Sequence, residues 1–180
     1  MAAVTAGILA ERFPFVQFGR GEHLIILPGM SLDNEVPGGF VRRSYAWGFR
    51  GLAARFRVSI VHRPVGLAGA VSTTELARRY AEVLADFGPA HVVGMSTDGL
   101  IAQQLALHSP QAVRSLPLVV AAARLSDSGR ATCEQWLRLA GAGPGSVGLI
   151  DGITGTLGVA STVLALTLGE GELAVALLGG

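Results

Sequence analysis

Residues 92–100 decide the fold of this chain and carry its most informative chemistry. They read Val92-Val93-Gly94-Met95-Ser96-Thr97-Asp98-Gly99-Leu100. The two valines belong to a short apolar run that begins at His91, and Leu100 opens an apolar stretch that closes at His108. A short apolar run is typical of a buried strand, and the longer stretch is typical of a buried helix. The sequence therefore predicts a serine in the turn between a strand and a helix.

Strand-like and helix-like segments alternate on both sides of this turn. Besides the run at 91–93, strands are predicted at residues 13–18, 23–27, 57–62 and 113–120. Helices are predicted at residues 40–56, 72–87, 100–108 and 126–139. This alternation predicts an α/β fold, with a predominantly parallel sheet and helices on both faces. Ligands of such sheets bind at the carboxyl ends of the strands, and Ser96 is expected there, after the third of four parallel strands.

The helix at 72–87 has the clearest boundaries. Ser72 followed three residues later by Glu75 is the pattern of a capping box, in which the serine side chain accepts a hydrogen bond from a free backbone N–H. Gly88 and Pro89 are expected to end the helix, the glycine in a left-handed conformation and the proline by removing a donor.

Length and composition exclude several classes of protein. The 180 residues suit one globular domain, and half of them are hydrophobic, so the chain as a whole is not disordered. With 14 basic and 13 acidic residues, the chain lacks the basic excess that marks a nucleic-acid-binding protein. Its single cysteine, Cys133, supplies neither an internal disulfide nor a multi-cysteine metal site. We therefore expect no metal and no nucleic-acid partner.

Neither end of the chain predicts a targeting or membrane-spanning segment. Residues 1–10 contain no basic residue ahead of their apolar stretch, which argues against a secretory signal. Residues 152–169 are uncharged over 18 positions, but they are rich in glycine and threonine and lack flanking arginine. A substitute strand or helix, or a poorly ordered tail, is the preferred interpretation, and a cytoplasmic protein with no membrane partner is expected.

The composition changes abruptly near residue 140. Residues 1–140 hold all the arginines, aromatic residues and histidines, whereas residues 141–180 hold 11 of the 25 glycines and none of those types. We therefore divide the chain into a core at 1–140 and an anomalous, glycine-rich apolar tail at 141–180. The change suggests a truncation or a frame change in the coding sequence, which translation of the other two reading frames would test.

The serine turn fits two interpretations. A sharp strand-to-helix turn can hold a serine Oγ above the strand end, as in the G-x-S-x-G nucleophile elbow, with free N–H groups of the helix behind it. Alternatively, Ser96 or Thr97 only caps an ordinary helix. The five-residue pattern fails at Asp98, where the elbow needs a small residue. We expect the Asp98 side chain to crowd a tight turn and its charge to oppose a nearby oxyanion, so that Asp98→Gly stabilises the fold or leaves it unharmed.

A wider series of segments resembles the α/β-hydrolase superfamily over residues 13–140. Segment 23–30 resembles its third strand and the following glycine-containing loop, and segment 62–67 resembles the loop after the fourth strand. Segment 94–99 resembles a G-x-S-T-G-G variant of the elbow, and segments 101–106, 109–110 and 113–116 resemble the helix and strand that follow. The resemblance implies an incomplete α/β-hydrolase fold.

The resemblance also implies a chemistry, namely hydrolysis of ester, thioester or amide-type bonds through a serine acyl-enzyme. Ser96 is then the nucleophile, and the backbone N–H groups of Met30 and Thr97 bind the oxyanion. The substrate is a small acyl compound, and no cofactor is needed.

The triad is where the sequence departs from the superfamily, which orders it as serine, acid, histidine. Only His108 follows Ser96, at the far end of the next helix, and His23 and His91 open their strands at the opposite edge. His62 closes its strand at the correct edge, but the strand order of the superfamily implies another strand between it and Ser96, a distance of roughly 9–10 Å.

No acid is assigned either. Asp127 follows the fourth strand, where some members of the superfamily place the acid, but as part of a Ser-Asp-Ser helix cap it has a simpler explanation, which is preferred. Asp151 lies in the tail, Asp33 and Glu35 are expected to be solvated, and Cys133 is expected to be a small core residue.

Three functions stay open from these residues. The first is a serine hydrolase impaired by the missing histidine, and the second is a non-catalytic remnant or binding module with the same half-fold. The third is a partner-dependent protein whose exposed sheet edge pairs with another chain.

Overall fold

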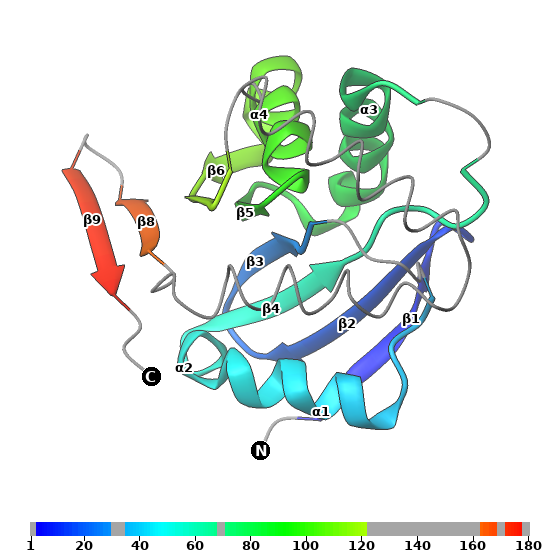
Figure 1. Cartoon of the computed structure of the whole chain (residues 1–180), viewed down its shortest axis with the longest axis vertical. Helices are drawn as coiled ribbons and strands as arrows, with labels where there is room; N and C mark the ends of the chain where they lie inside the picture. The colour runs from blue at the N-terminus through cyan, green and yellow to red at the C-terminus, as the bar shows by residue number, and fades with distance from the viewer. Residues whose placement is uncertain (1–2, 30–34, 68–70, 122–162, 169–171, 178–180) are drawn as a thin grey trace, which may run out of the picture.

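A mixed sheet forms the centre of the molecule. The computed structural model describes residues 3–29, 35–67, 71–121, 163–168 and 172–177. The sheet has seven strands in the order β1-β2-β4-β3-β5-β6, with β7 also paired to β5 (Figure 1). The strands are β1 (Thr5–Leu9), β2 (Phe13–Gly19), β3 (Glu22–Leu27), β4 (Phe56–Val61), β5 (Ala90–Met95), β6 (Val113–Ser115) and β7 (Leu118–Val119).

Most of the strand pairs are parallel. Within the seven-stranded sheet, as far as the structure describes it, the pairs β3/β4, β3/β5, β5/β6 and β5/β7 are parallel, and the pairs β1/β2 and β2/β4 are antiparallel. Parallel neighbours need a crossover, and helices supply it between β3 and β4, between β4 and β5, and between β5 and β6. The carboxyl ends of β3, β4 and β5 consequently meet at one edge of the sheet.

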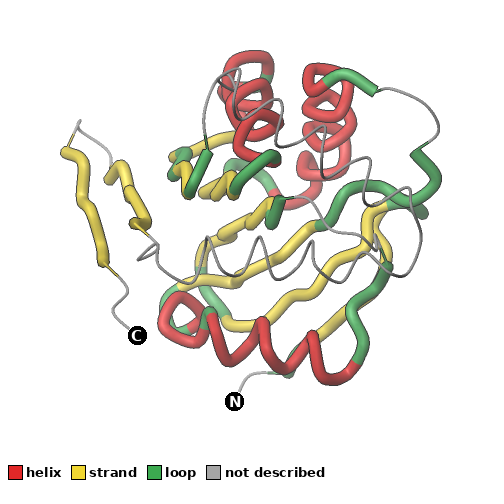
Figure 2. The backbone as a smooth tube through the Cα atoms, viewed as in Figure 1, coloured by secondary structure: helices red, strands yellow, loops and turns green. Residues whose placement is uncertain are grey.

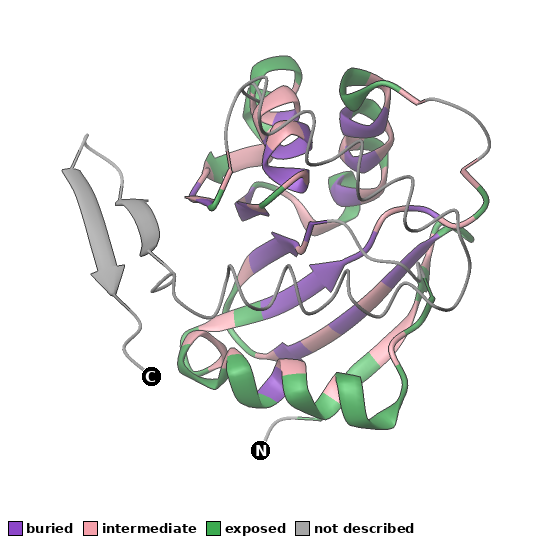
Figure 3. Cartoon of the chain, in the orientation of Figure 1, coloured by how far each residue is buried: buried purple, intermediate pink, exposed green. Residues whose placement is uncertain are grey.

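Helices cover both faces of the sheet, as Figure 2 shows. They are α1 (Gly39–Gly48), α2 (Arg50–Ala53), α3 (Thr73–Leu84) and α4 (Asp98–His108), with 3-10 turns at Ala85–Phe87 and Pro110–Ala112. Strand β3 shows why two layers form, because its side chains alternate. Ile25 and Leu27 pack in the cluster that contains α3 and α4, whereas Leu24 and Ile26 pack in the cluster that contains α1. The buried residues accordingly follow the middle of the sheet (Figure 3).

These observations confirm the predicted fold class, with local corrections. The sequence did not indicate β1, a short edge strand whose residues are exposed or half-buried. The predicted helix at 40–56 is broken at Phe49, where φ is −98° and ψ is 16°. The predicted strand at 113–120 is divided into β6 and β7, since Pro117 has no N–H to donate to a ladder.

The helix at 72–87 begins as predicted but ends differently. The Glu75 N–H donates to Ser72 Oγ at 3.1 Å, so the predicted cap is present. The α-helix ends at Leu84, and one 3-10 turn follows it. Gly88 has a φ of 67° but a ψ of −172°, which is outside the left-handed helical region that the sequence predicted.

The division at residue 140 and the predicted helix at 126–139 lie outside the described residues. In the tail, β8 (Val163–Leu168) and β9 (Glu172–Leu177) form a separate antiparallel pair. Within the part of the chain that the structure describes, no helix combines the length and the apolar character needed to cross a membrane.

Close packing between α4 and the end of β5 depends on Gly94. A Cβ at this position would lie 2.6 Å from Ala102 Cβ and 2.8 Å from Gly99 Cα. Real side chains do not approach so closely, so helix and strand would have to separate to admit even one methyl group. The small residue therefore brings the start of α4 close to the end of β5.

Gly94→Ala is expected to lower the free energy of unfolding by about 1–3 kcal/mol, because the added methyl group overpacks this contact. Gly51→Ala is the matched control, since a Cβ on Gly51 in α2 meets nothing within 4 Å. The control should be neutral or should stabilise the protein by about 0.5–1 kcal/mol. Urea unfolding of both variants measures the difference, and equal stabilities would contradict the packing argument.

Candidate active site

Ser96 lies in the turn between β5 and α4. Strand β5 ends at Met95 and α4 begins at Asp98, so the serine follows the third predicted parallel strand, as the sequence indicates. Its φ is +49°, a left-handed conformation that side chains other than glycine adopt at a cost of about 1–3 kcal/mol. The turn is fixed on both sides, since the Ser96 N–H donates to Val119 O at 2.9 Å and Ser96 O accepts from the Gly99 N–H at 3.0 Å. The strained turn holds an exposed serine side chain at the carboxyl edge of the sheet.

The loop after β3 passes directly beside the serine. Gly29 has a φ of +95°, and a Cβ at this position would lie 3.1 Å from Ser96 Cβ and 3.2 Å from Met95 O. Glycine therefore allows both the conformation of the loop and its approach. Met30, the predicted second oxyanion donor, is the next residue but lies outside the described residues, so its role stays a prediction.

Thr97 is the residue after the serine, and its N–H is the first predicted oxyanion donor. It is half-buried and immediately precedes α4. Within the described ranges, no hydrogen-bond acceptor is paired with this N–H. A helix N-terminus carries partial positive charge, which favours an anion at this place.

Asp98 is completely buried and fully paired. Its Oδ2 accepts a hydrogen bond from the Gly29 N–H at 3.0 Å. Its Oδ1 accepts from Arg63 Nε at 2.7 Å and forms an ion pair with Arg63 Nη2 at 2.6 Å. Arg63 also donates from Nη2 to Thr97 Oγ1 at 2.8 Å. One carboxylate thus joins the start of α4 to the loops that follow β3 and β4.

This arrangement corrects the sequence-based expectation for Asp98. The expectation assumed an uncompensated charge that only crowds the turn. The carboxylate instead points into a site where a guanidinium neutralises it and a backbone N–H satisfies it. Breaking such a buried pair costs more than the crowding, so the expected effect of Asp98→Gly changes sign.

His62 is the one described histidine that lies near this edge of the sheet. It follows β4, it is 4 % exposed, and neither ring nitrogen has a hydrogen-bond partner among the described residues. The order β4-β3-β5 places one strand between His62 and Ser96, as the sequence predicts, which is long for a direct hydrogen bond. Burial lowers the pKa of His62, and the negative charge of Asp98 opposes this shift.

The other three histidines lie elsewhere. His91 contacts Ser115 Oγ at 2.8 Å and Glu22 Oε2 at 3.3 Å, and His108 contacts Gln104 Oε1 at 3.2 Å. His23 opens β3 and packs edge-on against Phe87, with ring centroids 5.1 Å apart. None of them has a bond to the serine turn in the part of the chain that is described.

The candidate acids do not complete a triad within the described ranges. Asp33, Asp127 and Asp151, together with Cys133, lie outside them, and Glu35 is exposed. The same ranges hold no group of three His, Cys, Asp or Glu side chains suited to a metal ion.

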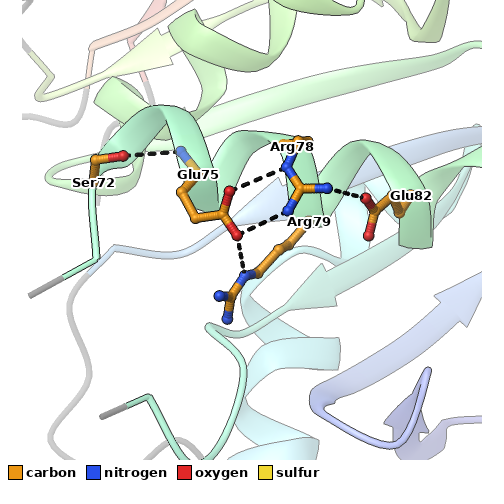
Figure 4. A network of polar contacts seen from close by, with 5 residues as sticks. All are labelled: Ser72, Glu75, Arg78, Arg79 and Glu82. Carbon is orange, nitrogen blue, oxygen red and sulfur yellow. Dashed lines mark hydrogen bonds and ion pairs between the residues drawn. The ribbon is translucent and has the colours of Figure 1, made fainter. Parts of the chain in front are cut away.

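A cleft of about 440 Å³ lies apart from the serine turn, between the turn after β1 and helix α3. Its wall carries an ion-pair network on one side of α3, in which Arg78 contacts Glu75 and Glu82 while Arg79 contacts Glu75 (Figure 4). Hydrogen bonds from both arginines lower the pKa of Glu75 to about 2. Acidic and basic groups are balanced here, and neither Ser96 nor Asp98 lines the cleft.

Arg63 is the residue of the site that sequence reasoning missed. It was considered only as part of the loop after the fourth strand. Its partner Asp98 is 35 residues away, and no local pattern links an arginine in one loop to an acid in another. The one available signal was the carboxylate itself, since an acid at a position that demands burial requires a cationic partner.

No family model matches the chain. Among curated proteins, it is 36% identical over 106 residues to a pimeloyl-[acyl-carrier protein] methyl ester esterase of Aeromonas hydrophila. The match covers 56% of this chain and 38% of the esterase, so the chain spans less than half of that relative's length.

Solved structures share the fold. A hydrolase from Pseudomonas aeruginosa matches with a TM-score of 0.57 at 20% identity, over 86% of this chain and 58% of that one. A structure described as an α/β hydrolase from Nostoc sp. PCC 7120 matches with a TM-score of 0.55 at 22% identity, over 77% of this chain and 51% of that one. These comparisons confirm the resemblance and the fold that the sequence predicted.

Asp98→Gly is expected to lower the free energy of unfolding by about 1.5–3 kcal/mol, the range for hydrogen bonds to a charged group. Arg63→Met should cost more, about 3–5 kcal/mol, because it leaves a fully buried carboxylate without its cation. Arg63 itself is 23% exposed, so water can solvate it when Asp98 is removed. Urea unfolding measures both values, and a more stable Asp98→Gly variant would support the crowding argument instead.

Stability is also expected to fall as the pH decreases below 6.5, the ordinary pKa of histidine. The lowered pKa keeps folded His62 neutral while the unfolded chain takes up a proton, so acid favours unfolding. His62→Phe should remove part of this dependence between pH 7.5 and 5, roughly the range over which histidine titrates. Burial lowers the pKa of His23 as well, so some dependence persists. His108→Gln, an exposed substitution, is the control, and a His62→Phe curve parallel to the wild type would contradict the assignment.

Proposed function

Because residues 3–121 carry the N-terminal part of the α/β-hydrolase fold, we propose that the chain is a serine hydrolase of that superfamily, acting on ester, thioester or amide-type bonds. The observation that carries the proposal is Ser96 in a left-handed turn at the end of β5, with the Gly29 loop against it and the start of α4 behind it. An exposed serine held in a strained conformation is an arrangement that a nucleophile needs and that a simple helix cap does not.

The proposed reaction is acyl transfer to Ser96. The Oγ attacks the carbonyl carbon of a small acyl substrate, and the carbonyl oxygen becomes an oxyanion that accepts hydrogen bonds from the N–H groups of Thr97 and Met30. The alcohol, thiol or amine leaves with a proton, and water then releases the acid and restores the serine. The curated relative is a methyl ester esterase, so simple esters are the first substrates to test.

The serine in this proposal is weakly activated. A serine hydroxyl needs a base to take its proton, and within the described residues no histidine is bonded to Ser96. We therefore infer an impaired hydrolase. The same observation favours a second candidate, a non-catalytic remnant or binding module that keeps the half-fold and the turn.

A fluorophosphonate probe separates the two candidates. It should label the wild type slowly and leave Ser96→Ala unlabelled, since the probe reacts only with a nucleophilic serine. Ester hydrolysis should have a kcat far below 10 s⁻¹, about the median for enzymes, because oxyanion donors and binding alone leave only roughly 10³–10⁴-fold acceleration over water.

Ser115→Ala is the control, because Ser115 is also a strand-end serine but contacts His91 at the opposite edge. It should be labelled like the wild type. A folded wild type that takes no label would identify the remnant, and an ordinary kcat would show that a base is present after all.

A further inference from the structure

Three segments that are distant in sequence meet at the Arg63–Asp98 ion pair. Gly29 lies 69 residues before Asp98, and Arg63 lies 35 residues before it. The ion-pair network of Figure 4 is different, because its members all belong to helix α3 and its pairs join residues three or four positions apart at the surface. Only Asp98 among the acidic residues in the described ranges is buried. A buried, satisfied carboxylate fixes geometry more strictly than exposed pairs do.

The contacts of this pair reach both sides of the serine. Asp98 Oδ2 accepts a hydrogen bond from the N–H of Gly29, the residue before Met30. Arg63 Nη2 donates a hydrogen bond to the side-chain hydroxyl of Thr97. Met30 and Thr97 carry the two N–H groups that the proposed function assigns to the oxyanion. One ion pair therefore touches the neighbour of one donor and the side chain of the other.

We propose that Arg63 and Asp98 are positioning residues that hold the Gly29 loop and the start of α4, with the Thr97 N–H, in place around Ser96. The proposal rests on the function proposed above and goes beyond it. At the position where the elbow takes a small residue, this chain uses a carboxylate that ties the Gly29 loop to the start of α4. Since the pair carries no net charge, it does not oppose a developing oxyanion as a lone carboxylate would.

Amide hydrogen exchange tests whether Asp98 holds the Gly29 loop, and it needs no enzymatic activity. In Asp98→Ala the Gly29 N–H loses its acceptor and should exchange about tenfold faster or more, the size expected for a hydrogen bond to a charged group. The Gly94 N–H, bonded to Pro117 O at 3.0 Å in the core strand β5, is the reference within the same molecule. Its exchange rate should be unchanged once the loss of global stability, measured by urea unfolding of the same variant, has been divided out of both rates. Equal acceleration at both amides, or at neither, would overturn the proposal.

Probe labelling tests the consequence for chemistry. Asp98→Ala should lower the maximal rate of fluorophosphonate labelling by about 10- to 100-fold, the effect of a displacement of about 1 Å, with little change in the concentration at half-maximal rate. Glu75→Ala removes an acidic residue of another arginine network and should label like the wild type. Labelling of Asp98→Ala at the wild-type rate would overturn the proposal, even if the Gly29 amide exchanges its hydrogen faster than in the wild type.

A milder variant covers the case in which Asp98→Ala does not fold. Thr97→Val removes only the hydroxyl that accepts from Arg63, and should slow labelling severalfold while the melting temperature changes little. An unchanged rate would overturn the role of Arg63 toward Thr97. A folded wild type that takes no label refutes the proposed function instead. In that case the exchange rate of the Gly29 amide in Asp98→Ala, or in Asp98→Asn, is the test of whether Asp98 holds the Gly29 loop.

Discussion

A single buried carboxylate determines how the carboxyl edge of this sheet is assembled. Asp98 lies at the first position of α4 and is completely excluded from solvent, where an unpaired charge would be very unfavourable. Its oxygens accept hydrogen bonds from the guanidinium of Arg63, in the loop after β4, and from the backbone N–H of Gly29, in the loop after β3. The two loops must therefore come to α4 if the carboxylate is to be buried at all, and Ser96 lies at the point where they meet.

The contact of the two loops with the start of α4 depends on close packing as well as on charge. Gly94 lets α4 approach the end of β5, and Gly29 lets the next loop pass against Ser96. With a larger residue at either position, the segments would stand further apart and the carboxylate would lose partners. Packing and electrostatics thus support the same local geometry, and the strained φ of Ser96 is held by both.

The proposed serine chemistry has two requirements, and the described residues offer a structural basis for one of them. The turn, the start of the helix and the neighbouring loop are organised around Ser96, whereas the buried His62 is one strand too far away and its ring nitrogens have no partner within the described ranges. A group that stabilises an oxyanion and a group that takes the serine proton are separate requirements, and a chain can satisfy the first without the second.

The sequence by itself determined the alternation of strands and helices, the place of Ser96 after the third parallel strand, and the cap at Ser72. Each of these depends on neighbours in the chain, because apolar periodicity and capping are local patterns. The local break at Phe49 was missed because a periodic apolar stripe continues across it. Only the tertiary structure decided that Asp98 joins Arg63 and Gly29 rather than crowding its own turn. Such a contact depends on which loops the strand order brings to one edge, and residues 35 and 69 positions apart leave no mark of it in a local pattern.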